Sequence, residues 1–155
     1  MNTYAANTEV SSDKSRSEIE RTLKRYGADA FGYGWEDNRA VVQFRANDRH
    51  VRFVLPLPDR AQFVRTPSRN PRPSAAQVEK AYEQAVRQRW RALALAVKAK
   101  LESVEAGIAT FEEEFLAHIV LPDGSTVAQF MVPQVAVAYE NGSMPKMLPG
   151  VGETS

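Results

Sequence analysis

The sequence predicts an α+β fold: an N-terminal helix, a three-stranded antiparallel meander, one long helix and two to three short C-terminal helices packed on one face of the sheet. Apolar residues alternate with a period of two between residues 30 and 55, as in strands with one buried face. At residues 17–27 and 74–104 they recur every three or four positions, as in helices with one apolar side. The 155 residues, 43% of them hydrophobic, suit one domain with one core.

The first helix is expected to begin at Ser17, which forms a capping-box pattern with Glu20. It is expected to end at Gly27, because glycine readily adopts the left-handed conformation that closes a helix. Its apolar side consists of Ile19, Leu23 and Tyr26. Three apolar anchors predict a short helix that docks on a larger body.

Three strands are expected between Ala30 and Leu55, joined by turns at residues 36–38 and 46–49. Pro56 ends the third strand, because proline cannot donate a hydrogen bond to a neighbouring strand. One face of the sheet is apolar and comprises Phe31, Tyr33, Trp35, Val42, Phe44, Val51 and Phe53. This pattern predicts a buried core face. The alternative is that the three aromatic residues of the first strand form an exposed platform on which bases stack.

Three segments are predicted to lack fixed structure. Residues 1–14 are mostly polar and lack periodicity, so they are expected to form a disordered tail, as are residues 151–155. Residues 15–150 then form a single domain. Within it, residues 59–74 are predicted to be a mobile basic loop, since they contain three prolines and no acidic residue after Asp59. The arginines of this loop are Arg60, Arg65, Arg69 and Arg72.

The longest helix is expected to begin after Ser74, which opens a second capping box, and to run to about Val104. Its apolar stripe includes Val86, Trp90, Leu93, Val97 and Leu101. A short helix is expected after Thr110. Pro133 is expected as the first residue of a final helix that ends near Gly142, because proline is favoured at that position.

Charge is sorted along the chain, although the formal net charge is only +1. Residues 39–100 carry fourteen Lys and Arg against four Asp and Glu, whereas residues 101–155 carry one against eight. A basic surface of this kind can bind a polyanion, or it can be neutralised by the acidic C-terminal third. Both interpretations remain open at the level of sequence.

Candidate nucleic-acid contacts come from three basic surfaces: the polar face of the sheet, the loop, and one side of the long helix. Lys and Arg on such surfaces neutralise phosphates and release counterions, which is the main source of non-specific nucleic-acid affinity. The candidate residues are Arg45, Arg52, Arg60, Arg65, Arg69, Arg72, Arg87, Arg91 and Lys98.

No catalytic or cofactor motif is present in the sequence, so no cofactor is expected and the protein is interpreted as non-enzymatic. Glu114 and His118 are spaced for a metal pair, but no further ligand is clustered with them, so no metal site is expected. The chain has no cysteine, which fits a reducing compartment, and no apolar run of about 20 residues that could span a membrane. These features predict a cytosolic protein that does not engage the membrane.

Five segments resemble a group of small bacteriophage and prophage proteins with no assigned activity. They are residues 25–28 (RYGA), 90–102 (WRALALAVKAKLE), 107–116 (GIATFEEEFL), 121–127 (LPDGSTV) and 144–150 (MPKMLPG). The resemblance brings no catalytic residues. It implies a phage setting and a location in the host cytoplasm. In that setting, small proteins commonly serve DNA replication and recombination or counter host defences.

The leading functional hypothesis is a phage-encoded, nucleic-acid-binding accessory protein, with single-stranded DNA preferred over duplex. The alternative is a protein-interaction module, such as an inhibitor of a host defence enzyme, whose partner is a host or phage protein. Assembly into a homo-oligomer is compatible with either hypothesis.

Overall fold

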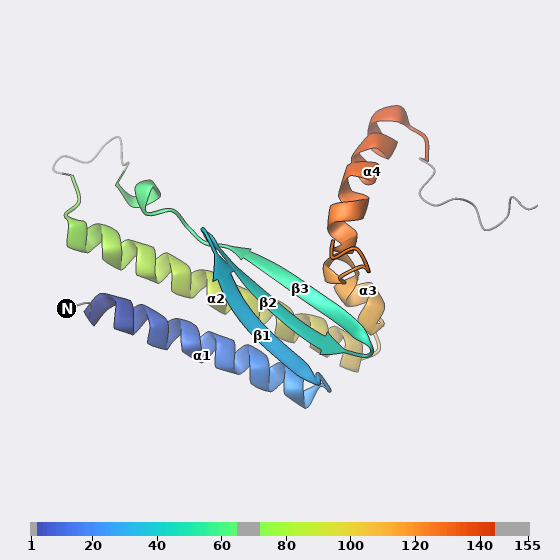
Figure 1. Cartoon of the computed structure of the whole chain (residues 1–155), viewed down its shortest axis with the longest axis horizontal. Coiled ribbons are helices and arrows are strands. Elements are labelled where there is room, and N and C mark those ends of the chain that lie inside the picture. Colours follow the sequence, from blue (N-terminus) through green and yellow to red (C-terminus); the bar gives the residue numbers. More distant parts are fainter. Residues whose placement is uncertain (1–2, 65–71, 145–155) are drawn as a thin grey trace, which may run out of the picture.

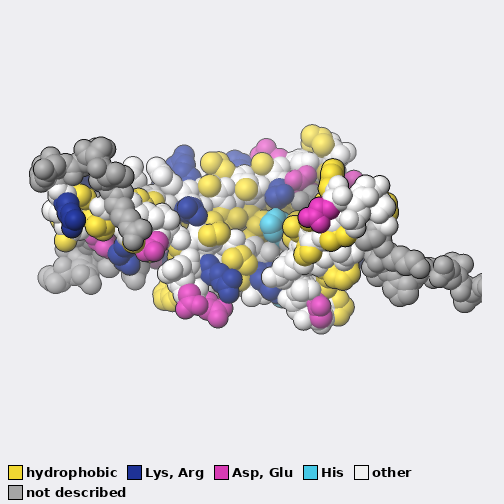
Figure 2. All heavy atoms as spheres, turned by 90° about the horizontal axis from the view of Figure 1, so that it is seen from above, with side chains coloured by type: hydrophobic (Ala, Val, Ile, Leu, Met, Phe, Trp, Pro, Cys, Tyr) yellow, Lys and Arg dark blue, Asp and Glu magenta, His cyan; other side chains and the backbone are white. Residues whose placement is uncertain are grey.

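The computed structural model describes residues 3–64 and 72–144, with side chains from Ser12 onward. Helix α1 (Thr3–Arg25) precedes a three-stranded antiparallel sheet, and helix α2 (Ala75–Glu105) follows it. The two long helices lie side by side, run in the same direction and cover the same face of the sheet (Figure 1). Seen from above, the body carries basic, acidic and hydrophobic side chains interspersed with one another (Figure 2). The predicted α+β class is confirmed.

The meander consists of β1 (Ala30–Glu36), β2 (Arg39–Ala46) and β3 (Arg49–Pro56), paired in that order. Asn47 and Asp48 join β2 to β3 and both have positive φ angles, of 51° and 59°. A two-residue turn of this type matches the twist of the strands that it connects, which explains why Asn and Asp stand there. The short loop thereby fixes the register of the sheet.

Helix α1 ends as expected, but it begins earlier than expected. Gly27 has a φ of 100°, and the N–H of Ala28 donates to the carbonyl of Leu23 at 2.9 Å, which closes the helix. The helix starts at Thr3 rather than at Ser17, so residues 3–14, expected as a tail, form its first turns. Once a packed turn exists, each added residue gains a backbone hydrogen bond, so extension is easier than nucleation.

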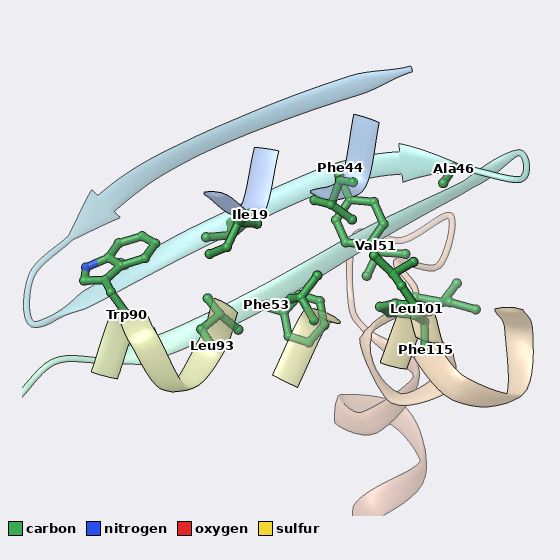
Figure 3. Close-up of a cluster of buried hydrophobic side chains, with 14 of the residues drawn as sticks. Ile19, Phe44, Ala46, Val51, Phe53, Trp90, Leu93, Leu101 and Phe115 are labelled. Carbon is green, nitrogen blue, oxygen red and sulfur yellow. The ribbon is translucent and has the colours of Figure 1, made fainter. Parts of the chain in front are cut away.

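The core lies between the sheet and the helices beneath it. Aromatic rings from three elements meet there: Phe44 of β2, Phe53 of β3 and Phe115, whose ring centroid lies 5.7 Å from that of Phe44 and 6.2 Å from that of Phe53. Both contacts are edge-to-face, an arrangement that aromatic pairs favour. Figure 3 shows these rings with Ile19 of α1 and Leu93 of α2 directed into the same cluster.

Helix α2 begins with the predicted capping box: the backbone N–H of Gln77 donates to Ser74 Oγ and the N–H of Ser74 donates to Gln77 Oε1. Its predicted apolar stripe is confirmed, since the buried hydrophobic residues are Val86, Trp90, Leu93, Val97 and Leu101. Between them, Leu95 stays 58% exposed. The helix therefore presents one narrow side to the core.

The C-terminal region attaches to the free edge of β3. Helix α3 (Phe111–Phe115) and the 3₁₀ turn η2 (Leu116–His118) lead into a short extended segment. There the N–H of Val120 donates to the carbonyl of His50 at 2.8 Å. Helix α4 (Val127–Asn141) follows, packs mainly against η2 and extends away from the body (Figure 1).

Two expectations about α4 need correction. Thr126 caps the helix through Gln129, so Pro133 lies inside the helix instead of opening it. The capping box begins the helix six residues earlier, and the proline removes only one backbone donor from it. Moreover, α4 buries none of its residues, although the C-terminal helices were expected to pack on the sheet. Of those helices, α3 contributes the buried residues Phe111 and Phe115.

Candidate nucleic-acid interface

The two arginines predicted on the polar face of the sheet are engaged within the protein. Arg45 Nε donates to Asp29 Oδ1 at 2.9 Å, and this hydrogen bond lowers the pKa of the Asp29 carboxyl group. Arg52 Nη2 donates to the carbonyl of Gly124 at 2.7 Å and so ties the turn before α4 to the sheet. Both side chains therefore stabilise local structure, and any phosphate would compete with these contacts.

The loop residues are only partly within the described chain. Arg60 opens the 3₁₀ turn η1 (Arg60–Phe63) and forms a bidentate pair with Glu79 of α2, at 2.9 and 3.1 Å. Its guanidinium also lies 4.0 Å from the ring centroid of Tyr82. Arg72 is exposed, whereas Arg65 and Arg69 lie outside the described residues.

The acidic helix α3 pairs with Arg49 and Lys100 and does not reach the three candidate cations on α2. Glu112 pairs with Arg49 of β3 at 2.6 Å, and Glu114 pairs with Lys100 at 3.5 Å. Glu113 caps the backbone at Thr110, whose hydrogen bonds lower the pKa of the Glu113 carboxyl group. The three candidates on α2, Arg87, Arg91 and Lys98, take part in none of the ion pairs between described residues.

A groove between α1 and α2 brings Lys98 together with two arginines that the sequence interpretation missed. Its lining consists of Glu18, Arg21, Thr22, Arg25 and Lys98, and its volume is about 300 Å³. We call it the α1–α2 groove. Arg21 and Arg25 are one helical turn apart, on the side of α1 that faces away from the buried Ile19 and Leu23. The groove holds three cations and one carboxylate.

A second hollow, of about 530 Å³, lies between α1, β1 and α2. We call it the aromatic hollow. Tyr33 and Trp35 of β1 line it and are 47% and 76% exposed, so their expected burial is wrong. They do share the core face. However, β1 is an edge strand, so its side chains have a neighbouring strand on one side only. Trp90 forms the floor, in edge-to-face contact with Tyr33 at 6.3 Å.

Arg16 of α1 forms a wall of the aromatic hollow. Its guanidinium lies 4.2 Å from the ring centroid of Tyr33 and 5.3 Å from that of Trp90, and it forms an ion pair with Asp13. A guanidinium held over aromatic rings is fixed in orientation, and here it also holds the Tyr33 ring in place. The exposed-platform alternative for Tyr33 and Trp35 thus has a geometric basis.

The residues considered for a metal pair have other contacts. Glu114 is paired with Lys100, and the His118 ring stacks on Phe53 at a centroid distance of 4.2 Å. Burial, reinforced by the nearby Lys100 charge, lowers the pKa of His118. Within residues 3–64 and 72–144 there is no group of three His, Cys, Asp or Glu side chains that could hold a metal ion.

Comparison of the chain with protein-family models, with curated proteins and with solved structures finds no match. Along the described residues, no helix has the length and apolar character that crossing a membrane requires. Functional inference therefore depends on the two surfaces described above, the α1–α2 groove and the aromatic hollow.

Proposed function

We propose that this protein is a non-enzymatic binder of single-stranded DNA that holds phosphates along the α1–α2 groove. The observation that carries the proposal is the meeting of Arg21, Arg25 and Lys98 in that groove. Cationic side chains that neutralise phosphates release condensed counterions, and this release supplies most of the sequence-independent affinity. Glu18 lies in the same groove and leaves a surplus of positive charge.

Arg87 and Arg91 extend this basic surface. They lie on the same side of α2 as Lys98, at spacings of four and seven residues along the helix. A strand that follows the groove would meet these side chains one after another. None of the three forms an ion pair with another described residue, so phosphate binding would not require an existing salt bridge to break.

The aromatic hollow supports a preference for single strands. Stacking of an unpaired base on an aromatic side chain contributes about 1–3 kcal/mol, and it is available only where bases are not stacked in a duplex. Trp35 is the most exposed aromatic residue of the hollow, and Tyr33 beside it is also exposed. The phage setting implied by the sequence resemblance is compatible with such a role.

The test is a titration of the protein with fluorescent single-stranded and duplex oligonucleotides over a salt series. Replacing Arg21, Arg25 and Lys98 together with Gln should weaken binding to all sequences equally. For every phosphate that is no longer neutralised, the slope of log affinity against log salt should become shallower by about 0.7 for single strands. Trp35→Ala should lower the single-strand affinity about tenfold and leave the duplex affinity nearly unchanged.

A matched control removes the same charge elsewhere. Gln at Arg45, Arg52 and Arg60 also removes three positive charges, but from side chains that already have internal partners. Its salt slope should stay close to that of the unmodified protein. If both triple variants showed the same slope of log affinity against log salt, the loss of affinity would be due to net charge alone. If the unmodified protein binds no oligonucleotide at low salt, the proposal fails and a protein partner becomes the leading hypothesis.

A further inference from the structure

One aromatic ring of the aromatic hollow has an open face. Tyr33 and Trp90 are in edge-to-face contact with each other, and Tyr82 lies against the Arg60 guanidinium. Trp35 differs from these three, because it is 76% exposed and has no aromatic or cation–π contact with another described side chain. The Trp35 indole is therefore the ring on which a ligand can stack without displacing an internal contact.

One carboxylate of the hollow is also without a partner. Asp13 forms an ion pair with Arg16. Asp37, in the turn between β1 and β2, takes part in none of the ion pairs or side-chain hydrogen bonds between described residues. Trp90, the floor of the hollow, lies at the end of the core nearest to this turn (Figure 3). The described lining thus offers an unpaired carboxylate and carries a net negative charge.

An open indole face and an unpaired carboxylate in one hollow suit a planar ligand that donates hydrogen bonds. An ionised carboxylate has two acceptor oxygens and no donor. Among the four DNA bases, guanine alone presents two adjacent donors on one edge, its N1–H and its 2-amino group. Adenine and cytosine place one amino group beside a ring nitrogen that accepts, and thymine places its N3–H between two carbonyl oxygens, which a carboxylate repels.

We propose that the aromatic hollow binds a guanine base of single-stranded DNA, which stacks on Trp35 and donates its N1–H and 2-amino hydrogens to the Asp37 carboxylate. The guanine site rests on the proposed function and adds base selectivity to it. The volume of the hollow, about 530 Å³, is typical of sites for small ligands. Its negative charge keeps phosphates outside, where the cations of the α1–α2 groove can neutralise them.

The backbone at Asp37 allows a substitution that preserves the turn. Asp37 has a φ of 53°, in the left-handed region that Asp and Asn tolerate better than other residues with a side chain. Asp37→Asn keeps the size of the side chain but replaces one acceptor oxygen with an NH₂ donor, which would face a donor of guanine. Asp48→Asn is the matched control. Asp48 has a φ of 59° in the other hairpin turn, at the opposite end of β2, and does not line the hollow.

The experiment measures competition with a fluorescent oligothymidylate of about 12 nucleotides, a length within the range that single-strand-binding domains contact. The competitors are the same oligothymidylate with one central guanine, adenine or cytosine, all at one low salt concentration. For the unmodified protein, the guanine should raise the affinity at least about tenfold over thymine alone, because a bidentate pair discriminates between bases by about this factor. Adenine and cytosine should raise it less.

The variants are compared by the ratio of guanine to thymine affinity, because removing a negative charge strengthens the attraction of every oligonucleotide. In Asp37→Asn this ratio should fall close to one. In Asp48→Asn it should remain at the value of the unmodified protein.

A second comparison changes the ligand and leaves the protein unmodified. The base of deoxyinosine is guanine without the 2-amino group, so it retains the N1–H and the purine ring. An oligothymidylate with one central deoxyinosine should bind at least about threefold more weakly than the one with guanine, because one hydrogen bond to Asp37 is lost.

Failure of the guanine site is distinguishable from failure of single-strand binding. If the unmodified protein binds no oligonucleotide at low salt, single-strand binding is wrong and the guanine site is wrong with it. Equal affinities for all oligonucleotides would leave single-strand binding intact and overturn the guanine site. A guanine preference that persists in Asp37→Asn, or a deoxyinosine oligonucleotide that binds as tightly as the guanine one, would also overturn it.

Discussion

Side chains at the centre of this protein are held by contacts between rings. The Phe44 and Phe53 rings lie 6.4 Å apart in a stacked arrangement on neighbouring strands, and Phe115 closes the cluster from α3. His118 extends it, since its imidazole stacks against Phe53. A titratable ring in this position couples the stability of the core to pH, because protonation would place a charge beside an apolar cluster.

The pH dependence can be predicted in sign. Burial and the Lys100 charge lower the pKa of His118 in the folded protein, so below about pH 6.5 the unfolded chain binds more protons than the folded one. Unfolding free energy should therefore decrease as the pH falls from about 6.5 toward the lowered pKa. In His118→Gln this part of the decrease should disappear, as urea titrations at several pH values would measure. His50→Gln, on the exposed side of the sheet, is the control and should retain the decrease.

At the scale of elements, α2 organises the molecule. It packs against α1 along its length, and Arg89 Nη1 donates to the carbonyl of Pro56 at 2.7 Å, which links the helix to the end of β3. Lys100 reaches the carbonyl of Glu114 at 3.1 Å and links the helix to α3. The strands and α3 thus share one helical support, and weaker packing along α2 should affect all of them.

A pair of leucines on α2 tests this role. Leu93 is buried in the core, so Leu93→Ala should lower the free energy of unfolding by about 2–5 kcal/mol, because apolar burial decreases and a cavity remains. Leu95 is on the solvent side, and Leu95→Ala should cost about 0.5 kcal/mol or less. Chemical denaturation of both variants gives the comparison. A larger decrease at Leu95 would mean that the helix is rotated relative to the orientation described.

At the scale of the whole molecule, the body and α4 contribute unequally to folding. The core is built from the two long helices, the sheet and α3, and the last buried residue before α4 is Thr126, its N-cap. Arg52 and the short bridge between Val51 and Ile119 hold the connection to the sheet. The body should consequently fold without most of α4.

A truncated chain tests this division. A protein that ends at Met131 keeps the Thr126–Gln129 cap. At low concentration its melting temperature should lie within roughly 5 °C of that of the full chain. Low concentration keeps any self-association of the full chain from adding stability by mass action. A chain that ends at Thr110 lacks Phe111, Phe115 and Ile119 and should melt without cooperativity. The same behaviour already at Met131 would show that α4 supports the core.

Local patterns in the sequence determined the elements. Alternation between Ala30 and Leu55 predicted the strands, the Ser74 cap and the stripe around Trp90 predicted α2, and Gly27 predicted the end of α1. These features are local, because caps, turns and one-sided burial depend on residues a few positions apart. The start of α1 was missed at Ser17, since a cap pattern cannot show that a helix extends further along a neighbour.

Tertiary structure alone decided which charges and aromatic residues are available to a partner. From sequence, Arg45, Arg52 and Arg60 were equivalent to Lys98, but long-range contacts to Asp29, Gly124 and Glu79 engage the first three. The parallel packing of α1 on α2 brought Arg21 and Arg25 to Lys98, residues that are more than seventy positions apart. The physical reason is that availability depends on neighbours in space, whereas a sequence pattern specifies only which side of its own element a residue occupies.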